Sequence, residues 1–205
     1  MKKLFVLMTC VMLTGNIFSQ SVKENDLPDA LVWFGLDFSR IKLIGTSVDF
    51  PDLEKITSHY FKSWNNLMIS EQRKYNLKKA YNVDSVYYDV KRTIERSRKN
   101  NSKDILTINK QTLTEDDVKA IINDCSTDSD IKTGLIYVVE SFNKIDREGT
   151  VLVTFFNIKT KEIILMKRVV GKPKGFGLRN YWIGAIYKIL KKSGFKYKQW
   201  MAERN

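Results

Sequence analysis

Three strand-like segments lie close together between residues 133 and 170, with only short turns between them. Each is rich in β-branched and aromatic residues, and each turn is polar. Strands joined by such short connections can pair only in an antiparallel way. The sequence therefore predicts an antiparallel three-stranded meander, with strands at 133–145, 150–158 and 162–170 and turns at 146–149 and 159–161.

The segment after the meander combines a glycine-rich loop with the clearest helical pattern of the chain. From Leu178 to Leu190 the apolar residues recur at three- and four-residue steps, which predicts a helix with one buried stripe. Gly194 follows this stripe, and a glycine at a helix end often adopts the left-handed conformation that stops the helix. We therefore predict a helix that ends at Ser193 and Gly194, followed by a basic aromatic tail.

The first half of the chain alternates between strand-like and helix-like segments. Residues 30–45 predict a strand in which Val32, Phe34, Leu36 and Phe38 share one buried face. The remaining predicted elements are a helix at 52–68, a short helix at 70–80, a strand at 83–91, a helix end or exposed loop at 92–103, and a helix that begins with Thr114 as its cap and ends near Cys125.

Together these segments predict a single α+β domain over residues 30–205. Helices with one apolar stripe and strands with one apolar face favour two layers. We therefore expect a mostly antiparallel sheet of about five strands with helices packed on one face. The length of 205 residues suits one domain of this kind, and no internal repeat divides the chain.

The N-terminus has the layout of a secretory signal peptide. Two lysines precede a short apolar run, and small residues follow it, so we predict a signal peptide at 1–20 that is cleaved near Ser19 or Gln20. An alternative is lipidation of Cys10, but apolar residues continue past it, which favours plain cleavage. Residues 21–29 are polar and predict a flexible leader, and the mature protein is expected to be periplasmic or secreted.

The chain is strongly basic, with a formal net charge of +12. Loss of the two lysines of the signal peptide leaves about +10. Outside the cytoplasm this charge favours anionic surface polymers or lipid head groups as partners, and nucleic acid is not expected. The alternative is that the basic surface only keeps the protein in solution.

The composition gives little support to a metal site or to a reactive cysteine. Cys125 is the single cysteine after signal cleavage, so no internal disulfide can form. Because His59 is the only histidine, we predict no metal and no cofactor. A nucleophile and base made of Cys125 and His59 has no local pattern to support it.

The glycine-rich loop at 171–177 is a candidate anion site, because it leads into a helix N-terminus that offers unpaired amides. The alternative is that its glycines only form a tight turn, with the basic side chains in solvent. The candidate ligand-binding residues here are Lys172, Lys174, Gly175, Gly177 and Arg179.

Three polar residues interrupt apolar strands and are candidates for buried catalytic groups: Asp37, Glu140 and Arg168. A pair of carboxylates in one cleft could act as general acid and base. The structural alternative is an ion pair between Glu140 and Arg168 on adjacent strands, which would hold the sheet together.

The C-terminal tail interleaves lysines with aromatic rings and is the last candidate binding segment, with Lys196, Tyr197, Lys198 and Trp200. Rings and ammonium groups in this arrangement suit an anionic surface or a glycan. The alternative is that the rings pack on the domain and only the lysines face outward.

Two motifs carry a resemblance to known sequences: Phe34 to Ser39, which reads FGLDFS, and Gly175 to Trp182, which reads GFGLRNYW. Together they resemble a group of uncharacterised secreted α+β proteins of Gram-negative bacteria. The resemblance implies an α+β domain outside the cytoplasm and implies no catalytic residue.

We therefore predict an exported, non-catalytic envelope domain that binds a protein partner or an anionic surface polymer. The basic tail, the last helix and the glycine-rich loop would form its binding surface. The alternative is a small periplasmic hydrolase or transferase that uses Asp37, Glu140 or Arg168 in one cleft.

Overall fold

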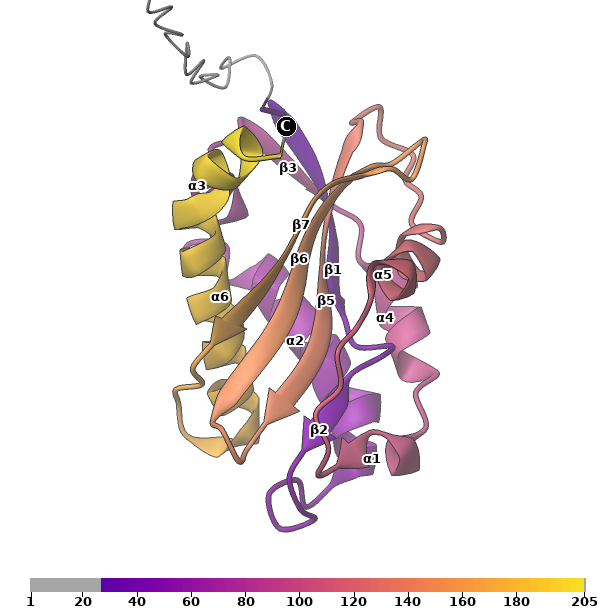
Figure 1. Ribbon diagram of the computed structural model, residues 1–205, viewed down its shortest axis with the longest axis vertical. Helices are drawn as coiled ribbons and strands as arrows, with labels where there is room; N and C mark the ends of the chain where they lie inside the picture. The colour runs from indigo at the N-terminus through magenta and orange to yellow at the C-terminus, as the bar shows by residue number, and fades with distance from the viewer. Residues whose placement is uncertain (1–26, 205) are drawn as a thin grey trace, which may run out of the picture.

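The computed structural model describes residues 27–204, which form one mixed sheet with helices on both of its faces (Figure 1). The predicted signal peptide, Cys10, the cleavage position and residues 21–26 of the predicted leader lie outside the described residues. Among the helices of the described part, none has both the length and the apolar character that crossing a bilayer requires.

The sheet has seven strands within the described part of the chain, and β5 lies at its centre. One edge of β5 pairs in parallel with β1 and, further along, with β2. Its other edge pairs with β6 in an antiparallel way, and β7 follows β6. The strands β3 and β4 extend the parallel part beside β1 and β2. The bounds are β1 Ala30–Asp37, β2 Lys42–Ile44, β3 Ser85–Tyr88, β4 Leu106–Thr107, β5 Thr133–Asn143, β6 Glu148–Asn157 and β7 Ile163–Gly171.

The predicted meander is confirmed, but the predicted α+β fold with a mostly antiparallel sheet is wrong. Four strand pairs, β1–β3, β1–β5, β2–β4 and β2–β5, are parallel, which gives an α/β-like arrangement. The connections from β2 to β3 and from β4 to β5 contain helices, and a helical crossover returns the chain in the same direction. Apolar patterns show where strands lie but not how distant strands pair.

The helices cover both faces of the sheet, which corrects the two-layer prediction. On one face, α2, α3 and α6 share a core with the sheet. On the other face, α5 covers a second cluster, and α4 lies along β1 beside it (Figure 1). The bounds are α1 Leu53–Lys55, the π-helical turn η2 Ile56–Tyr60, α2 Phe61–Ser70, α3 Leu77–Tyr81, α4 Lys91–Arg98, the 3-10 turn η3 Ser102–Asp104, α5 Glu115–Ile122 and α6 Gly177–Ala202.

A bulge in β1 changes which of its side chains face each of the two cores. The register of β1 against β5 shifts between Trp33 and Gly35, and Gly35 has a φ of +101°, which favours glycine. Val32 and the bulge residue Phe34 face α5, whereas Leu36, after the bulge, faces the opposite core. The predicted single face of alternating residues is therefore split between two cores.

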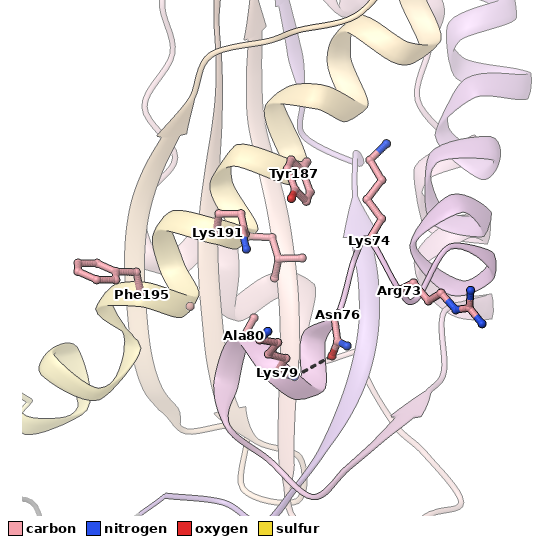
Figure 2. Close-up of a pocket in the computed structure, with 10 residues that line it drawn as sticks. Arg73, Lys74, Asn76, Lys79, Ala80, Tyr187, Lys191 and Phe195 are labelled. Atoms are coloured by element: carbon pink, nitrogen blue, oxygen red, sulfur yellow. Dashed lines mark hydrogen bonds between the residues drawn. The ribbon is translucent and has the colours of Figure 1, made fainter.

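The last helix continues past Gly194, which corrects the predicted helix end and the predicted separate tail. Gly194 lies against α3, and a Cβ atom at this position would be 2.8 Å from the carbonyl oxygen of Ala80. Figure 2 shows Ala80 on α3 beside α6. The glycine therefore allows two helices to approach closely and does not end one of them.

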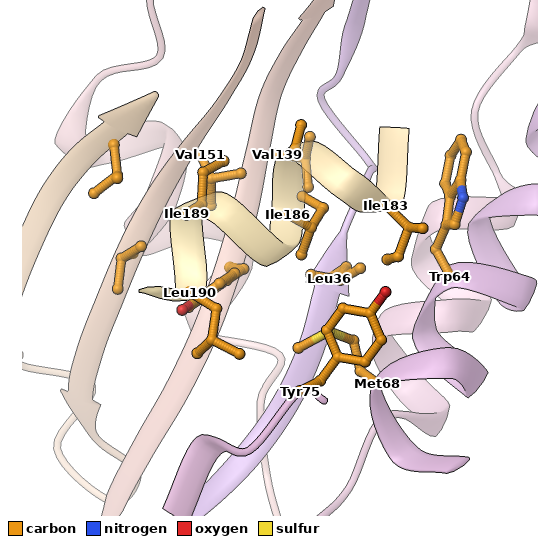
Figure 3. Close-up of a cluster of buried hydrophobic side chains, with 14 of the residues drawn as sticks. Leu36, Trp64, Met68, Tyr75, Val139, Val151, Ile183, Ile186, Ile189 and Leu190 are labelled. Carbon is orange, nitrogen blue, oxygen red and sulfur yellow. The ribbon is translucent and has the colours of Figure 1, made fainter. Parts of the chain in front are cut away.

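The larger core lies between α6 and the sheet (Figure 3). Ile186 and Ile189 of α6 are buried against the cluster that contains Val139 of β5 and Val151 of β6. The stripe of α6 that the sequence predicts is thus the stripe that the structure buries. This packing fixes α6 along the sheet and leaves its opposite side to solvent.

The close approach of α6 and α3 can be tested with Gly194→Ala. Alanine favours a helix by about 1 kcal/mol over glycine, but here its methyl group would push on the backbone of Ala80. We expect a net loss of about 1–3 kcal/mol in the free energy of unfolding, measured by chemical denaturation. Lys188→Ala, which is exposed on the same helix, is the control. Unchanged or higher stability of the glycine variant would contradict the close approach.

Candidate functional site

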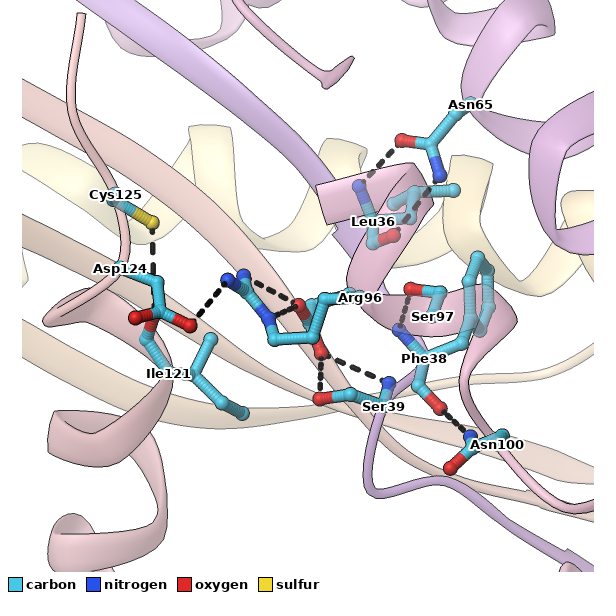
Figure 4. Close-up of polar contacts among 11 residues, drawn as sticks. Leu36, Phe38, Ser39, Asn65, Arg96, Ser97, Asn100, Ile121, Asp124 and Cys125 are labelled. Atoms are coloured by element: carbon cyan, nitrogen blue, oxygen red, sulfur yellow. Dashed lines mark hydrogen bonds and ion pairs between the residues drawn. The ribbon is translucent and has the colours of Figure 1, made fainter. Parts of the chain in front are cut away.

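Asp37 ends β1 and is fully buried in an ion pair. Its Oδ2 accepts hydrogen bonds from Arg96 Nε at 2.8 Å and lies 2.7 Å from Arg96 Nη2. Its Oδ1 accepts from the backbone N and the hydroxyl of Ser39 at 2.9 and 2.5 Å. On its other side, Arg96 Nη1 lies 3.7 Å from Asp124, which follows α5, and Figure 4 shows these two side chains facing each other. Because both oxygens are engaged by donors, Asp37 joins β1 to α4 and has no free lone pair for acid–base work.

Cys125 lies next to this ion pair and is buried. Its thiol donates a weak hydrogen bond to the carbonyl oxygen of Ile121 at 3.8 Å. Burial raises the pKa of the thiol to about 11, against the smaller lowering effect of Arg96. His59 is exposed in the π-helical turn of another segment. The thiol therefore stays protonated near neutral pH and is not an activated nucleophile.

Glu140 and Arg168 form a second ion pair, but not between adjacent strands as predicted. Glu140 is the extra residue of a bulge in β5, and Arg168 lies on β7, with β6 between them. Arg168 Nε and Nη2 donate to the two carboxylate oxygens at 3.0 Å each. The backbone N of Leu113 donates to Glu140 Oε1 at 2.6 Å, and its carbonyl oxygen accepts from Arg168 Nη2 at 2.8 Å. The pair thus clamps the segment that leads into α5.

The glycine-rich loop has the geometry of a turn that packs on its own helix. Gly175 and Gly177 have φ angles of +141° and +74°, a region that favours glycine. A Cβ atom on Gly184 of α6 would be 2.1 Å from the carbonyl oxygen of Lys174, so the loop lies directly on the helix. The side chains of Lys172 and Lys174 are exposed. The turn geometry and the packing of the loop on α6 therefore explain why glycines occupy these positions, and a bound ligand is not needed to explain them.

The residues of the predicted tail belong to the last turns of α6, and they divide between core and solvent. Tyr197 is buried, and its ring stacks on Phe155 with centroids 4.7 Å apart. Trp200 is half-buried, whereas Lys196 and Lys198 are exposed. The rings of Tyr197 and Trp200 therefore pack on the domain, as the structural alternative expected, whereas the ring of Phe195 is exposed.

A groove with a volume of about 570 Å³ lies between α3, α6 and the segment at 73–76. Four cationic side chains line it: those of Arg73, Lys74, Lys79 and Lys191. No aspartate, glutamate, histidine or cysteine lines it. Figure 2 shows these side chains with the rings of Tyr187 and Phe195. We call this surface the cationic groove.

The helix α6 supplies one wall of the cationic groove. Between Gly177 and Ala202 it carries six basic residues and no acidic residue. Tyr187, Lys191 and Phe195 follow one another at four-residue steps, so they lie along one side of the helix. The apolar stripe of α6 faces the sheet, and this side therefore remains available to a ligand.

The opposite wall is anchored by α3. The side chain of Asn76 caps α3 by accepting from the backbone N of Lys79 at 2.8 Å. Leu77 and Tyr81 are buried, which fixes the rotation of this short helix. Lys74 lies over the ring of Tyr75, 4.9 Å from its centroid. The cations of both walls are thus placed by buried neighbours.

The arrangement of the cationic groove suits anion binding. Its cations attract negative charge, and its rings offer apolar contacts beside them. Among residues 27–204, no group of three or more side chains that could hold a metal ion is present.

Sequence reasoning missed the cationic groove because its walls lie far apart in the chain. One signal was available, since a helix with six basic and no acidic residues is unusual for a solvated surface. The second wall depends on contacts between α3 and α6, which no local pattern reveals.

No family model matches this chain, and no curated protein sequence is significantly similar to it. The resemblance to secreted proteins of Gram-negative bacteria therefore stays a prediction.

The structural role of Asp37 predicts a large loss of stability on substitution. Asp37→Asn leaves the mostly buried guanidinium of Arg96 without its anion, which should cost about 3–5 kcal/mol in the free energy of unfolding. Arg40→Ala breaks an exposed pair with Asp117 and should cost less than about 1 kcal/mol. Denaturant titration of both variants tests this, and equal losses would contradict the buried role of Asp37.

Burial of Cys125 predicts slow chemical modification in the folded protein. Because alkylation needs the thiolate, a pKa of about 11 and a side chain that is 1% exposed should protect the thiol. We expect little alkylation by iodoacetamide at about pH 8 and rapid alkylation in denaturant, where the pKa returns to about 8.5. Mass spectrometry of the two samples measures this, and fast modification of the folded protein would contradict the prediction.

Proposed function

We propose that this chain is an exported, non-catalytic binding domain of the cell envelope, and that its cationic groove binds an anionic polymer. The observation that carries the proposal is the set of four basic side chains that line one groove, whose lining contains no acidic residue. Lys74 lies 3.8 Å from Glu71 just outside the lining, and the other three cations form no ion pair with a described carboxylate. The formal charge of +12 would also attract such a polymer from a distance.

The positive charge alone would attract many kinds of anion, and the aromatic rings reduce the number of ligand classes that fit the groove. Tyr187 and Phe195 are eight residues apart on α6, which corresponds to roughly 12 Å along a helix. Lys191 lies midway between them. A polymer whose units carry both a negative charge and an apolar ring face would contact both kinds of side chain, and an acidic polysaccharide has this chemistry.

The size of the groove agrees with a small part of such a polymer. A volume of about 570 Å³ falls within the range of roughly 300–1,000 Å³ that small-molecule sites occupy. The groove would therefore hold a few polymer units at a time, while the remaining lysines of α6 attract the flanking units. Affinity would then increase with polymer length.

The alternative, a small hydrolase or transferase, requires a free carboxylate in a cleft. Asp37 and Glu140 each accept two donor contacts from an arginine, and neither lines the cationic groove. No contact among the described residues favours the enzyme hypothesis.

Charge reversal in the cationic groove tests the proposal. We expect Lys79→Glu/Lys191→Glu to weaken binding to polygalacturonate by roughly tenfold or more, because each cation near an anionic surface contributes about 1 kcal/mol. Binding is measured by isothermal titration calorimetry with the mature chain, at low and at physiological salt. Uncharged dextran should not bind.

The matched control is Lys103→Glu/Lys159→Glu, which changes the net charge equally at two exposed positions outside the groove. This variant should keep most of the wild-type affinity at physiological salt. Equal losses in the two double variants would mean that only overall charge matters, and the proposed site would be wrong.

A further inference from the structure

Four loops at one end of the molecule each expose a large apolar side chain. The exposed fractions are 87% for Val48, 71% for Ile108, 64% for Ile145 and 96% for Phe176. This end lies opposite the C-terminus, at the bottom of Figure 1. Single exposed apolar residues are common, but four at one end form a feature that needs an explanation. We call these four residues the apolar tip.

The four loops are neighbours in space although they are distant in sequence. The backbone N of Gly45 donates to the carbonyl oxygen of Thr107 at 2.9 Å, and the backbone N of Lys144 donates to that of Ile44 at 2.9 Å. Lys110 pairs with Asp146 at 2.7 Å. These contacts join the loops that carry Val48, Ile108 and Ile145.

The loop that carries Phe176 belongs to the same end. Gly149, just after the turn that carries Ile145, pairs with Gly171 at the end of β7. The ring of Tyr181 in the first turns of α6 lies 4.6 Å from Lys144 Nζ. The backbone after β7 therefore emerges beside the other three loops.

The exposure of Val48 is not caused by a loosely held loop. Phe50, two residues after Val48, is buried and stacks on Trp182 with centroids 5.8 Å apart. Asp49 accepts from the backbone N and the hydroxyl of Thr46 at 2.9 Å each, and these hydrogen bonds lower the pKa of its carboxyl. The loop is thus anchored while Val48 points away from the core.

The charges at this end suit an anionic surface. Asp146 pairs with Lys110, whereas Asp49 accepts hydrogen bonds from the neutral Thr46 and keeps its negative charge. Lys172 and Lys174 are exposed beside Phe176, and within residues 27–204 neither pairs with a carboxylate. Cations next to exposed apolar side chains favour the interface of a membrane with anionic lipids.

We propose that the apolar tip inserts into the interfacial region of a phospholipid bilayer, with Lys172 and Lys174 at the headgroup phosphates. A lipid surface fits better than a protein partner because the four side chains come from separate loops and their chain neighbours, such as Ser47, Asn109 and Gly175, have no large apolar side chain. Separate projections can enter a fluid interface, whereas a stable protein interface needs a closely packed patch of roughly 800 Å² on each partner.

The test is binding of the mature chain to phosphatidylcholine vesicles that contain phosphatidylglycerol. We expect Ile145→Ser/Phe176→Ser to weaken the binding by roughly tenfold or more, because two large side chains no longer leave water. The control is Tyr87→Ser, which removes an exposed large apolar side chain that lies outside both the apolar tip and the cationic groove and should bind as the wild type does. Thermal unfolding checks that both variants are folded.

A second arm separates this proposal from the one on the cationic groove. Lys79→Glu/Lys191→Glu should keep most of its binding to these vesicles at physiological salt even where it loses binding to polygalacturonate. Equal vesicle binding by the tip variant and the control would overturn the proposal. The same holds if the wild type does not bind vesicles but forms a dimer in analytical ultracentrifugation that Ile145→Ser/Phe176→Ser abolishes, since the tip would then be a protein interface.

Discussion

The strand β5 is the element on which the rest of the structure depends. All of its residues except Thr133 are buried, and it pairs along both edges. Parallel strands lie on one side of it and the antiparallel hairpin partner on the other. Its two faces support separate cores, one under α6 and one under α5. The position of α6, and with it one wall of the cationic groove, follows from this strand.

Local features of the fold could be predicted from the sequence, whereas long-range pairing could not. The meander follows from short turns, and the helix capped by Thr114 follows from its capping chemistry, which the structure confirms as a capping box. The parallel pairing of β1 with β5 joins segments about a hundred residues apart, and the pattern of apolar residues does not predict which distant strands pair. Gly35 was the one visible signal for the bulge in β1.

The candidate site also combines local features, which the sequence predicts, with long-range contacts, which it does not. The predicted site residues of the loop and tail lie within short segments of the sequence. Most of them have a structural role in turn geometry or packing, as Gly175 and Tyr197 do. The cationic groove instead combines residues about 110 positions apart, such as Lys79 and Lys191. Gly194 is central to this difference, because its role as a contact with Ala80 is visible only once the helices are placed together.

The most direct test of the account is a map of backbone amide chemical shifts by NMR as a short galacturonate oligosaccharide is added to the mature chain. Binding in the cationic groove predicts saturable shifts at residues 73–80 of one wall and 187–195 of the other. Shifts centred on the glycine-rich loop at 171–177, or shifts that never saturate and spread over all exposed lysines, would contradict it.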